Sequence, residues 1–232
     1  MPSYTYTKEK YDRLKYKFNG SEKIIENYSQ AYQDMFVLTM LDGKRNGTYL
    51  EVGSGVAKTI NNTYLLEKFF DWKGVSIDIQ EIMKDSFTEH NRKNEIIIHD
   101  ALKLDYDKLF IERNFNKQID YLQLDIEPQH NTLKCLNLIP FDKYRFSIIT
   151  YETDLYCNTI SKEESLKNRD ESRRILLSHG YELILGNVCN LSTTDPFEDW
   201  YIDPNIIDKN ILKLFKKSSE FNNVSEIFLL NS

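Results

Sequence analysis

Short apolar runs alternate with amphipathic stretches along most of this chain. Runs rich in Val, Ile, Leu and Tyr predict β-strands at residues 48–52, 74–79, 95–99, 119–126, 146–151 and 181–188. Apolar positions at helical spacing predict helices at residues 30–41, 62–70, 82–91, 106–113, 131–138 and 162–179, the first of them capped by Ser29. Helix and strand therefore alternate through most of the chain.

This alternation favours a doubly wound α/β fold. Single helices between strands imply right-handed crossovers and a largely parallel sheet with helices on both faces. The high Ile, Val and Leu content of the strands suits burial on both sides. Ligands bind to such sheets beyond the carboxyl ends of the strands. We therefore expect the functional residues directly after the strands.

The 232 residues fit one large domain, because no repeat, low-complexity tract or Gly/Pro/Ser-rich linker divides them. Residues 1–28 are polar and rich in Tyr and Lys. We expect them to form a short helical or irregular N-terminal extension, followed by a domain that spans residues 29–232.

Charge and composition narrow the classes of partner. The formal net charge of −6, with acids and bases interspersed, argues against a nucleic-acid backbone as substrate. The N-terminus has no apolar signal segment, and no window approaches the roughly 18 apolar residues of a membrane span, so we expect a cytoplasmic protein without a membrane partner. Cys135, Cys157 and Cys189 lack metal-ligand spacing and are predicted to be free thiols. The sequence gives no indication of the oligomeric state.

Motifs after the first three predicted strands suit an adenosine-containing ligand. Glu51-Val52-Gly53-Ser54-Gly55 follows the first strand, and its glycines allow a tight turn and a close approach to a ligand. Lys58 replaces the third glycine of a dinucleotide fingerprint, which argues against a bound pyrophosphate. Asp78 ends the second strand, where a carboxylate can accept both hydroxyls of a ribose. After the third strand, Asp100 precedes Ala101 and can accept a hydrogen bond from an adenine amino group.

Acidic residues follow the fourth and fifth predicted strands. Asp125 and Glu127 end one strand and Glu152 ends the next, so their carboxylates can meet and hold Mg²⁺ or Mn²⁺. The alternative is that these acids cap the helices that follow. His130, just beyond Glu127, is a candidate to take a proton from a hydroxyl. A solvent-exposed histidine at a helix N-terminus is the equally open alternative.

Taken in order, the motifs resemble those of the FkbM family of S-adenosylmethionine-dependent methyltransferases. The resemblance covers roughly residues 28 to 188. It rests on Tyr28-Ser29-Gln30 with Gln33-Asp34, Tyr49-Leu50-Glu51-Val52-Gly53-Ser54-Gly55, Asn62-Thr63-Tyr64-Leu65-Leu66-Glu67, Trp72-Lys73-Gly74-Val75-Ser76-Ile77-Asp78, Asp120-Tyr121-Leu122-Gln123-Leu124-Asp125-Ile126-Glu127, and Phe141-Asp142-Lys143-Tyr144-Arg145-Phe146 leading into Ile148-Ile149-Thr150-Tyr151-Glu152.

The resemblance implies a class I methyltransferase (Rossmann-like) fold, with a seven-stranded sheet whose last strand is antiparallel. It also implies methyl transfer from S-adenosylmethionine to oxygen, commonly a hydroxyl of a sugar or polyketide. The glycines would lie against the cofactor, Asp78 would hold its ribose, Asp100 would face its adenine, and Asn62 with Thr63 would lie near its methionine end. The residues expected at the cofactor are Gln30, Glu51, Gly53, Ser54, Gly55, Asn62, Thr63, Asp78, Ile79, Asp100 and Ala101.

One position departs from the family pattern. Many members carry Gly after the Asp-x-Glu element, and this chain has Pro128. Proline fixes φ and removes an N–H donor, so the loop over the acceptor should differ in shape. The departure leaves the cofactor prediction unchanged and weakens any transfer of acceptor identity from the family.

The leading hypothesis is a metal-assisted O-methyltransferase that acts on a hydroxyl of a sugar, glycan or similar small acceptor. Asp125, Glu127 and Glu152 would hold the metal, and His130, Asp125 or Glu152 would serve in catalysis. One alternative is a metal-independent methyltransferase with another small-molecule or nitrogen acceptor. A nicotinamide-dependent oxidoreductase and a non-catalytic cofactor-binding protein are the others.

Overall fold

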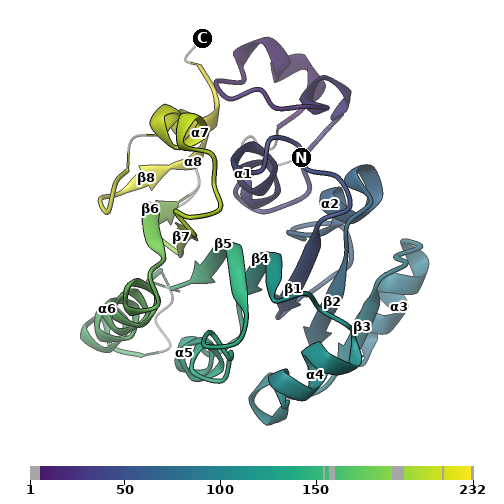
Figure 1. Ribbon diagram of the computed structural model, residues 1–232, viewed down its shortest axis with the longest axis vertical. Helices are drawn as coiled ribbons and strands as arrows, with labels where there is room; N and C mark the ends of the chain where they lie inside the picture. The colour runs from purple at the N-terminus through teal and green to yellow at the C-terminus, as the bar shows by residue number, and fades with distance from the viewer. Residues whose placement is uncertain (1–5, 154, 157–159, 190–195, 216, 231–232) are drawn as a thin grey trace.

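The computed structural model describes residues 6–153, 155–156, 160–189, 196–215 and 217–230. Its centre is one sheet with the strand order β3-β2-β1-β4-β5-β7-β6-β8, flanked by helices on both sides (Figure 1). The strands are β1 (Thr48–Val52), β2 (Lys73–Asp78), β3 (Glu95–Ile98), β4 (Gln118–Leu124), β5 (Arg145–Glu152), β6 (Glu182–Cys189), β7 (Glu198–Ile202) and β8 (Asn222–Asn223). The α-helices are α1 (Gln33–Met40), α2 (Tyr64–Phe70), α3 (Ile82–Glu89), α4 (Tyr106–Glu112), α5 (Gln129–Leu136), α6 (Lys162–Ser178), α7 (Lys209–Leu214) and α8 (Val224–Phe228).

The first five strands of the sheet run parallel, and β7 runs antiparallel between β5 and β6. This confirms the predicted doubly wound sheet, in which the seventh strand along the chain, β7, is antiparallel. A two-residue strand, β8, pairs with β6 in parallel and adds an eighth strand to the seven implied. Because β1 pairs with both β2 and β4, the order reverses beside β1 and opens a crevice at the carboxyl ends of these strands.

The central strands are buried on both faces because alternate side chains enter two different cores. Tyr121 of β4 packs into a core formed with α1, α2 and α8. Its neighbour Leu122 packs into the opposite core, formed with α4, α5 and α6. Burial from Ile119 to Leu124 is continuous, as expected for a parallel strand covered on both sides.

The N-terminal segment is part of this packing. Tyr6, Leu14, Phe18 and Ile24 are buried in the same core as α1. All eight residues of α1 are buried, because the sheet covers one side of the helix and these N-terminal residues with α8 cover the other (Figure 1). The described part of the N-terminal extension predicted at residues 1–28 therefore packs against α1.

Most predicted elements are present within a few residues of their expected positions. The fourth strand ends at Leu124, so Asp125 and Ile126 lie in the loop beyond it, and the helix predicted at residues 131–138 is Gln129–Leu136. The sequence did not locate β7, α7, β8 or α8. Cys135 and Cys189 are buried free thiols, as predicted, and Cys157 lies outside the described residues. Within the described ranges, no helix has the length and apolar character needed to cross a bilayer.

Candidate functional site

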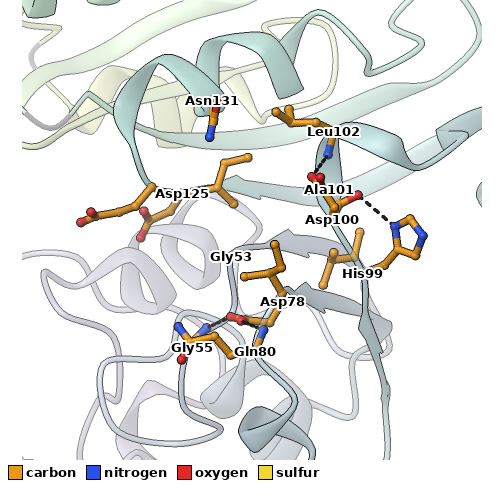
Figure 2. Close-up of a pocket in the computed structure, with 14 residues that line it drawn as sticks. Gly53, Gly55, Asp78, Gln80, His99, Asp100, Ala101, Leu102, Asp125 and Asn131 are labelled. Atoms are coloured by element: carbon orange, nitrogen blue, oxygen red, sulfur yellow. Dashed lines mark hydrogen bonds between the residues drawn. The ribbon is translucent and has the colours of Figure 1, made fainter.

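A cavity of about 450 Å³ opens at the carboxyl ends of β1, β2, β3 and β4. Figure 2 shows Asp125 at one end of it, Asp100 and His99 at the other, and Asp78 between them. The residues that line it are Gly53, Gly55, Ile77, Asp78, Ile79, Gln80, His99, Asp100, Ala101, Leu102, Asp125, Ile126, Glu127 and Asn131. The cavity therefore lies where the sequence placed the cofactor.

Glycine occupies the two positions 53 and 55 after β1 for different structural reasons. Gly53 has φ +80°, and a Cβ there would collide with the carbonyl oxygen of Asp125, so this position requires glycine for packing. Gly55 has φ +56°, and a Cβ there would have no neighbouring atom within 4 Å. Gly55 therefore presents its backbone to open space on the cavity wall, where a ligand can approach closely.

Asp78 is held rigidly at the end of β2. Its Oδ2 accepts a hydrogen bond from the Gly55 N–H at 2.9 Å, and its Oδ1 accepts one from the Gln80 N–H at 2.9 Å. Each carboxylate oxygen can accept a second hydrogen bond. With 8 % of its surface exposed, Asp78 faces the cavity as a fixed double acceptor. This arrangement fits the two adjacent hydroxyls of a ribose.

The far end of the cavity combines a short acid with apolar surface. Asp100 accepts a hydrogen bond from the Leu102 N–H at 3.0 Å, and this bond, followed by one from Lys103, lowers the pKa of its carboxyl. Ala101 and Leu102 line the wall beside it, and Ile79 is 69 % exposed at its rim. Apolar side chains beside one fixed hydrogen-bond acceptor suit a flat heterocycle with an exocyclic amino group.

Four predicted cofactor residues lie behind the glycine loop and do not line the cavity. Glu51 is buried and accepts hydrogen bonds from Ser76 at 2.6 Å and Thr63 at 3.0 Å, and burial raises the pKa of its carboxyl. The Asn61 amide joins Glu51 to the Ser54 carbonyl. Ser54, Asn62 and Thr63 are buried as well. These contacts fix the shape of the loop that carries Gly53 and Gly55.

Arg92, which no sequence motif indicated, also holds the residues behind the glycine loop in place. Its fully buried side chain pairs with Glu67 at 2.6 Å and donates to Thr63 Oγ1 at 2.8 Å. Gln30, another predicted cofactor residue, lies in the loop before α1 and is absent from the cavity lining. The lining also includes Gln80, Leu102 and Asn131, which the sequence offered no pattern to detect.

The acidic residues predicted to bind a metal are only partly brought together. Asp125 and Glu127 line the cavity, whereas Glu152 is buried at the end of β5 and does not. His130 lies in α5 and is also outside the lining. Among the residues that the structure describes, no three His, Cys, Asp or Glu side chains form a group that could hold a metal ion. Asp154, two residues after Glu152 in the sequence, lies outside them.

Glu198 of β7 is a buried carboxyl that the sequence did not indicate. It lies opposite Glu152 in the antiparallel register of β5 and β7. Its Oε2 accepts hydrogen bonds from Gln33 Nε2 at 2.9 Å and Trp200 Nε1 at 2.6 Å. Burial, and after it the negative charge of Asp125, raises the pKa of Glu198 to about 8. Glu198 therefore lies behind the Asp125 end of the cavity.

Comparison with known proteins identifies the fold. No family model and no curated protein matches the chain. A Clostridium thermocellum protein assigned as an rRNA methylase matches with a TM-score of 0.53 and 11 % identity over 76 % of this chain and 96 % of its own. Aeropyrum pernix fibrillarin with natively bound S-adenosyl-L-methionine matches with a TM-score of 0.50 and 15 % identity, over 75 % and 74 % of the two chains. Spodoptera frugiperda DNMT2 matches with a TM-score of 0.50 and 13 % identity, over 76 % and 54 %.

The chain has the class I S-adenosylmethionine-dependent methyltransferase fold. The predicted fold class is thereby confirmed. At these identities the likeness concerns the fold alone, and the resemblance to the FkbM family stays a prediction from the sequence motifs.

Proposed function

We propose that this protein is an S-adenosylmethionine-dependent methyltransferase whose cofactor occupies the cavity between Asp100 and Asp125. The observation that carries the proposal is the fixed carboxylate of Asp78, held by the Gly55 and Gln80 N–H groups on the cavity wall. The fold supports it, because the cavity lies at the reversal of strand order where such sheets bind their ligands.

The residues of this chain would divide the binding as follows. Asp78 would accept hydrogen bonds from the ribose hydroxyls, and Gly55 would let the backbone approach the ligand closely. Asp100, with Ala101 and Ile79, would bind the adenine ring. The bound cofactor supplies a methyl group already activated on a sulfonium sulfur. The protein then mainly aligns the acceptor atom, which can lower the barrier by as much as about 7–11 kcal/mol.

We further propose that the acceptor atom is a hydroxyl oxygen of a sugar, glycan or similar small molecule. The carboxyl-rich end of the cavity supports this, since Asp125 can orient a hydroxyl and accept its proton. A divalent cation at Asp125, Glu127 and Glu152 is a separate part of the proposal that rests on the sequence motifs. One protein of the same fold is assigned as an rRNA methylase, so an RNA oligonucleotide belongs in the acceptor screen beside sugars.

Isothermal titration with S-adenosylhomocysteine tests the cofactor assignment. Asp78→Asn should weaken binding at least tenfold, because the amide cannot accept hydrogen bonds on both sides. Asp85→Asn, at an exposed position of the neighbouring helix α3, is the matched control and should bind like the wild type. Binding of NAD in place of S-adenosylhomocysteine would instead support the oxidoreductase alternative.

A further inference from the structure

Glu198 carries a buried carboxyl that the proposed function leaves without a role. It has 1 % of its surface exposed, and both of its described donors, Gln33 and Trp200, reach the same oxygen, Oε2. None of the described residues donates a hydrogen bond to Oε1. Gln33 begins α1, which brings a polar side chain from the covering layer onto the end of β7.

The surroundings of Glu198 are rich in hydrogen-bond acceptors and negative charge. The acidic groups are Asp125 after β4, Glu152 on β5 and Asp199, the next residue of β7. Tyr121 of β4, which faces Glu198, also faces Glu51 on β1 and Asp34 on α1. Asp199 is paired with Arg173 at 2.7 Å, whereas no lysine or arginine of the described chain forms an ion pair with Glu198. Tyr121, the titratable hydroxyl facing this group from β4, hydrogen-bonds to Thr150 at 2.7 Å.

A neutral side chain in the same layer gives an independent indication of a ligand. Gln123 has 2 % of its surface exposed, and its Oε1 has no hydrogen-bond partner in the described structure. It lies two residues before Asp125, and it faces the same side of β4 as Tyr121. A buried acceptor without a donor, near the buried carboxyl of Glu198 that forms no ion pair with a described lysine or arginine, favours a ligand that carries positive charge or N–H and O–H donors.

The cofactor itself brings such a charge to this end of the cavity. With adenine at Asp100 and ribose at Asp78, the sulfonium end of the cofactor would lie toward Asp125, which is at the other end of the cavity (Figure 2). S-adenosylmethionine carries a positive sulfonium, whereas its product S-adenosylhomocysteine has a neutral thioether in the same position. Carboxylates in a weakly hydrated site distinguish these two ligands by charge.

We propose that Glu198, behind Asp125, is a specificity-determining residue that makes the site prefer the sulfonium cofactor over its thioether product. The inference rests on the proposed function, because it requires the cofactor in this cavity. Its consequence is that, with Glu198 ionised, methyl transfer itself weakens the hold on the cofactor. The positive charge that Glu198 attracts disappears when the C–S bond breaks and its electron pair returns to sulfur.

Paired titrations with S-adenosylmethionine and S-adenosylhomocysteine in one alkaline buffer test the proposal. In the wild type the sulfonium ligand should bind more tightly, and Glu198→Gln should lower the ratio of the two affinities about tenfold. Sinefungin, which carries an amine in place of the S-methyl group, should lose affinity in this variant as S-adenosylmethionine does. Glutamine keeps an oxygen for the Gln33 and Trp200 donors, and a thermal melt checks that the variant is folded.

Two controls separate charge from structure. Gln33→Ala removes one hydrogen bond to Glu198 but keeps the carboxyl, so in a strongly alkaline buffer, where that carboxyl is ionised, it should change the affinity ratio far less than Glu198→Gln does. Glu220→Gln removes an exposed carboxyl and should do the same. If Glu198→Gln weakens both ligands equally, Glu198 is only structural and the proposal is wrong. If the wild type binds neither ligand, the proposed function fails and this inference fails with it.

Discussion

At the scale of single residues, the site depends on backbone positions as much as on side chains. Gly53 and Gly55 both adopt positive φ, but only Gly53 lies where a Cβ would meet another part of the backbone. The collision would be with the Asp125 carbonyl, so Gly53 joins the ends of β1 and β4 at the cavity. Two glycines that look equivalent in the sequence therefore serve packing and ligand approach, respectively.

Alanine substitutions should separate these two roles. Gly53→Ala should destabilise the fold by several kcal/mol, because the backbone of β1 or β4 must move. Gly55→Ala should cost only about 1 kcal/mol for its positive φ and should mainly weaken binding of S-adenosylhomocysteine. Urea unfolding and titration of both variants measure the difference. Equal loss of stability in the two variants would contradict this assignment.

The buried carboxyl of Glu198 should also make stability depend on pH. Its pKa in the folded protein, about 8, lies above the ordinary value of 4.5, so the folded state keeps this proton longer than the unfolded chain. The stabilisation is fully present below the unfolded pKa and is lost as pH rises toward the folded pKa. Between about pH 5 and about pH 9, the wild type should lose on the order of a few kcal/mol relative to Glu198→Gln. Urea unfolding at both pH values checks this, and parallel curves for the two proteins would contradict it.

At the scale of elements, the N-terminal segment supports the helix that covers the Asp125 end of the site. Asp34 of α1 is fully buried and accepts hydrogen bonds from the N–H groups of Tyr28 and Ser29, at 2.8 and 3.1 Å. The Tyr28 carbonyl in turn accepts a hydrogen bond from the Asn61 N–H at 3.0 Å. These contacts connect the chain before α1 to the loop that follows Gly55.

Substitutions in this segment should show that it belongs to the core. Phe18→Ala should destabilise the protein by about 3–5 kcal/mol, the usual cost of removing a buried aromatic ring. Ile25→Ala is the nearby control, because Ile25 is 63 % exposed, and it should change stability by less than about 0.5 kcal/mol. Urea titration measures the free energies of unfolding of the wild type and the two variants. A neutral Phe18→Ala would mean that the segment is an appendage, as the sequence predicted.

At the scale of the whole molecule, the order of strands spreads the functional groups along one edge of the sheet. Asp78 ends β2 and Asp100 follows β3, whereas Glu152 and Glu198 lie on β5 and β7, on the other side of β1 and β4. The proposed ribose and adenine contacts and the buried acidic group therefore occupy opposite parts of the edge, with Asp125 between them. Cofactor binding and any metal requirement should then be separable.

Chelation tests this separation. EDTA should leave the affinity for S-adenosylhomocysteine unchanged, because the proposed ribose and adenine contacts include none of the predicted metal ligands. Methyl transfer to a hydroxylated acceptor would fall on chelation, and recover with Mg²⁺ or Mn²⁺, only if the predicted metal takes part. Loss of cofactor affinity in EDTA would contradict the separation of the ribose and adenine contacts from the predicted metal site.

The sequence alone determined what depends on local patterns. Apolar runs and helical spacing located six strands and the helices between them, and chain order placed Gly53, Asp78, Asp100 and Asp125 directly after strands. In a parallel α/β sheet these strand ends share one edge, so the main cavity residues could be predicted. The FkbM resemblance added the antiparallel last strand but not its position.

Only the tertiary structure decided what depends on distant contacts. Glu51 lies one strand position from the glycine loop, yet side-chain alternation turns it into a buried network away from the cavity. Glu198 meets Gln33 across 165 residues of sequence, and β7 pairs between two strands that both precede it. The N-terminal segment packs onto α1 because the helix needs cover on a second side. No local pattern encodes such contacts, since they arise only when separate elements are packed together.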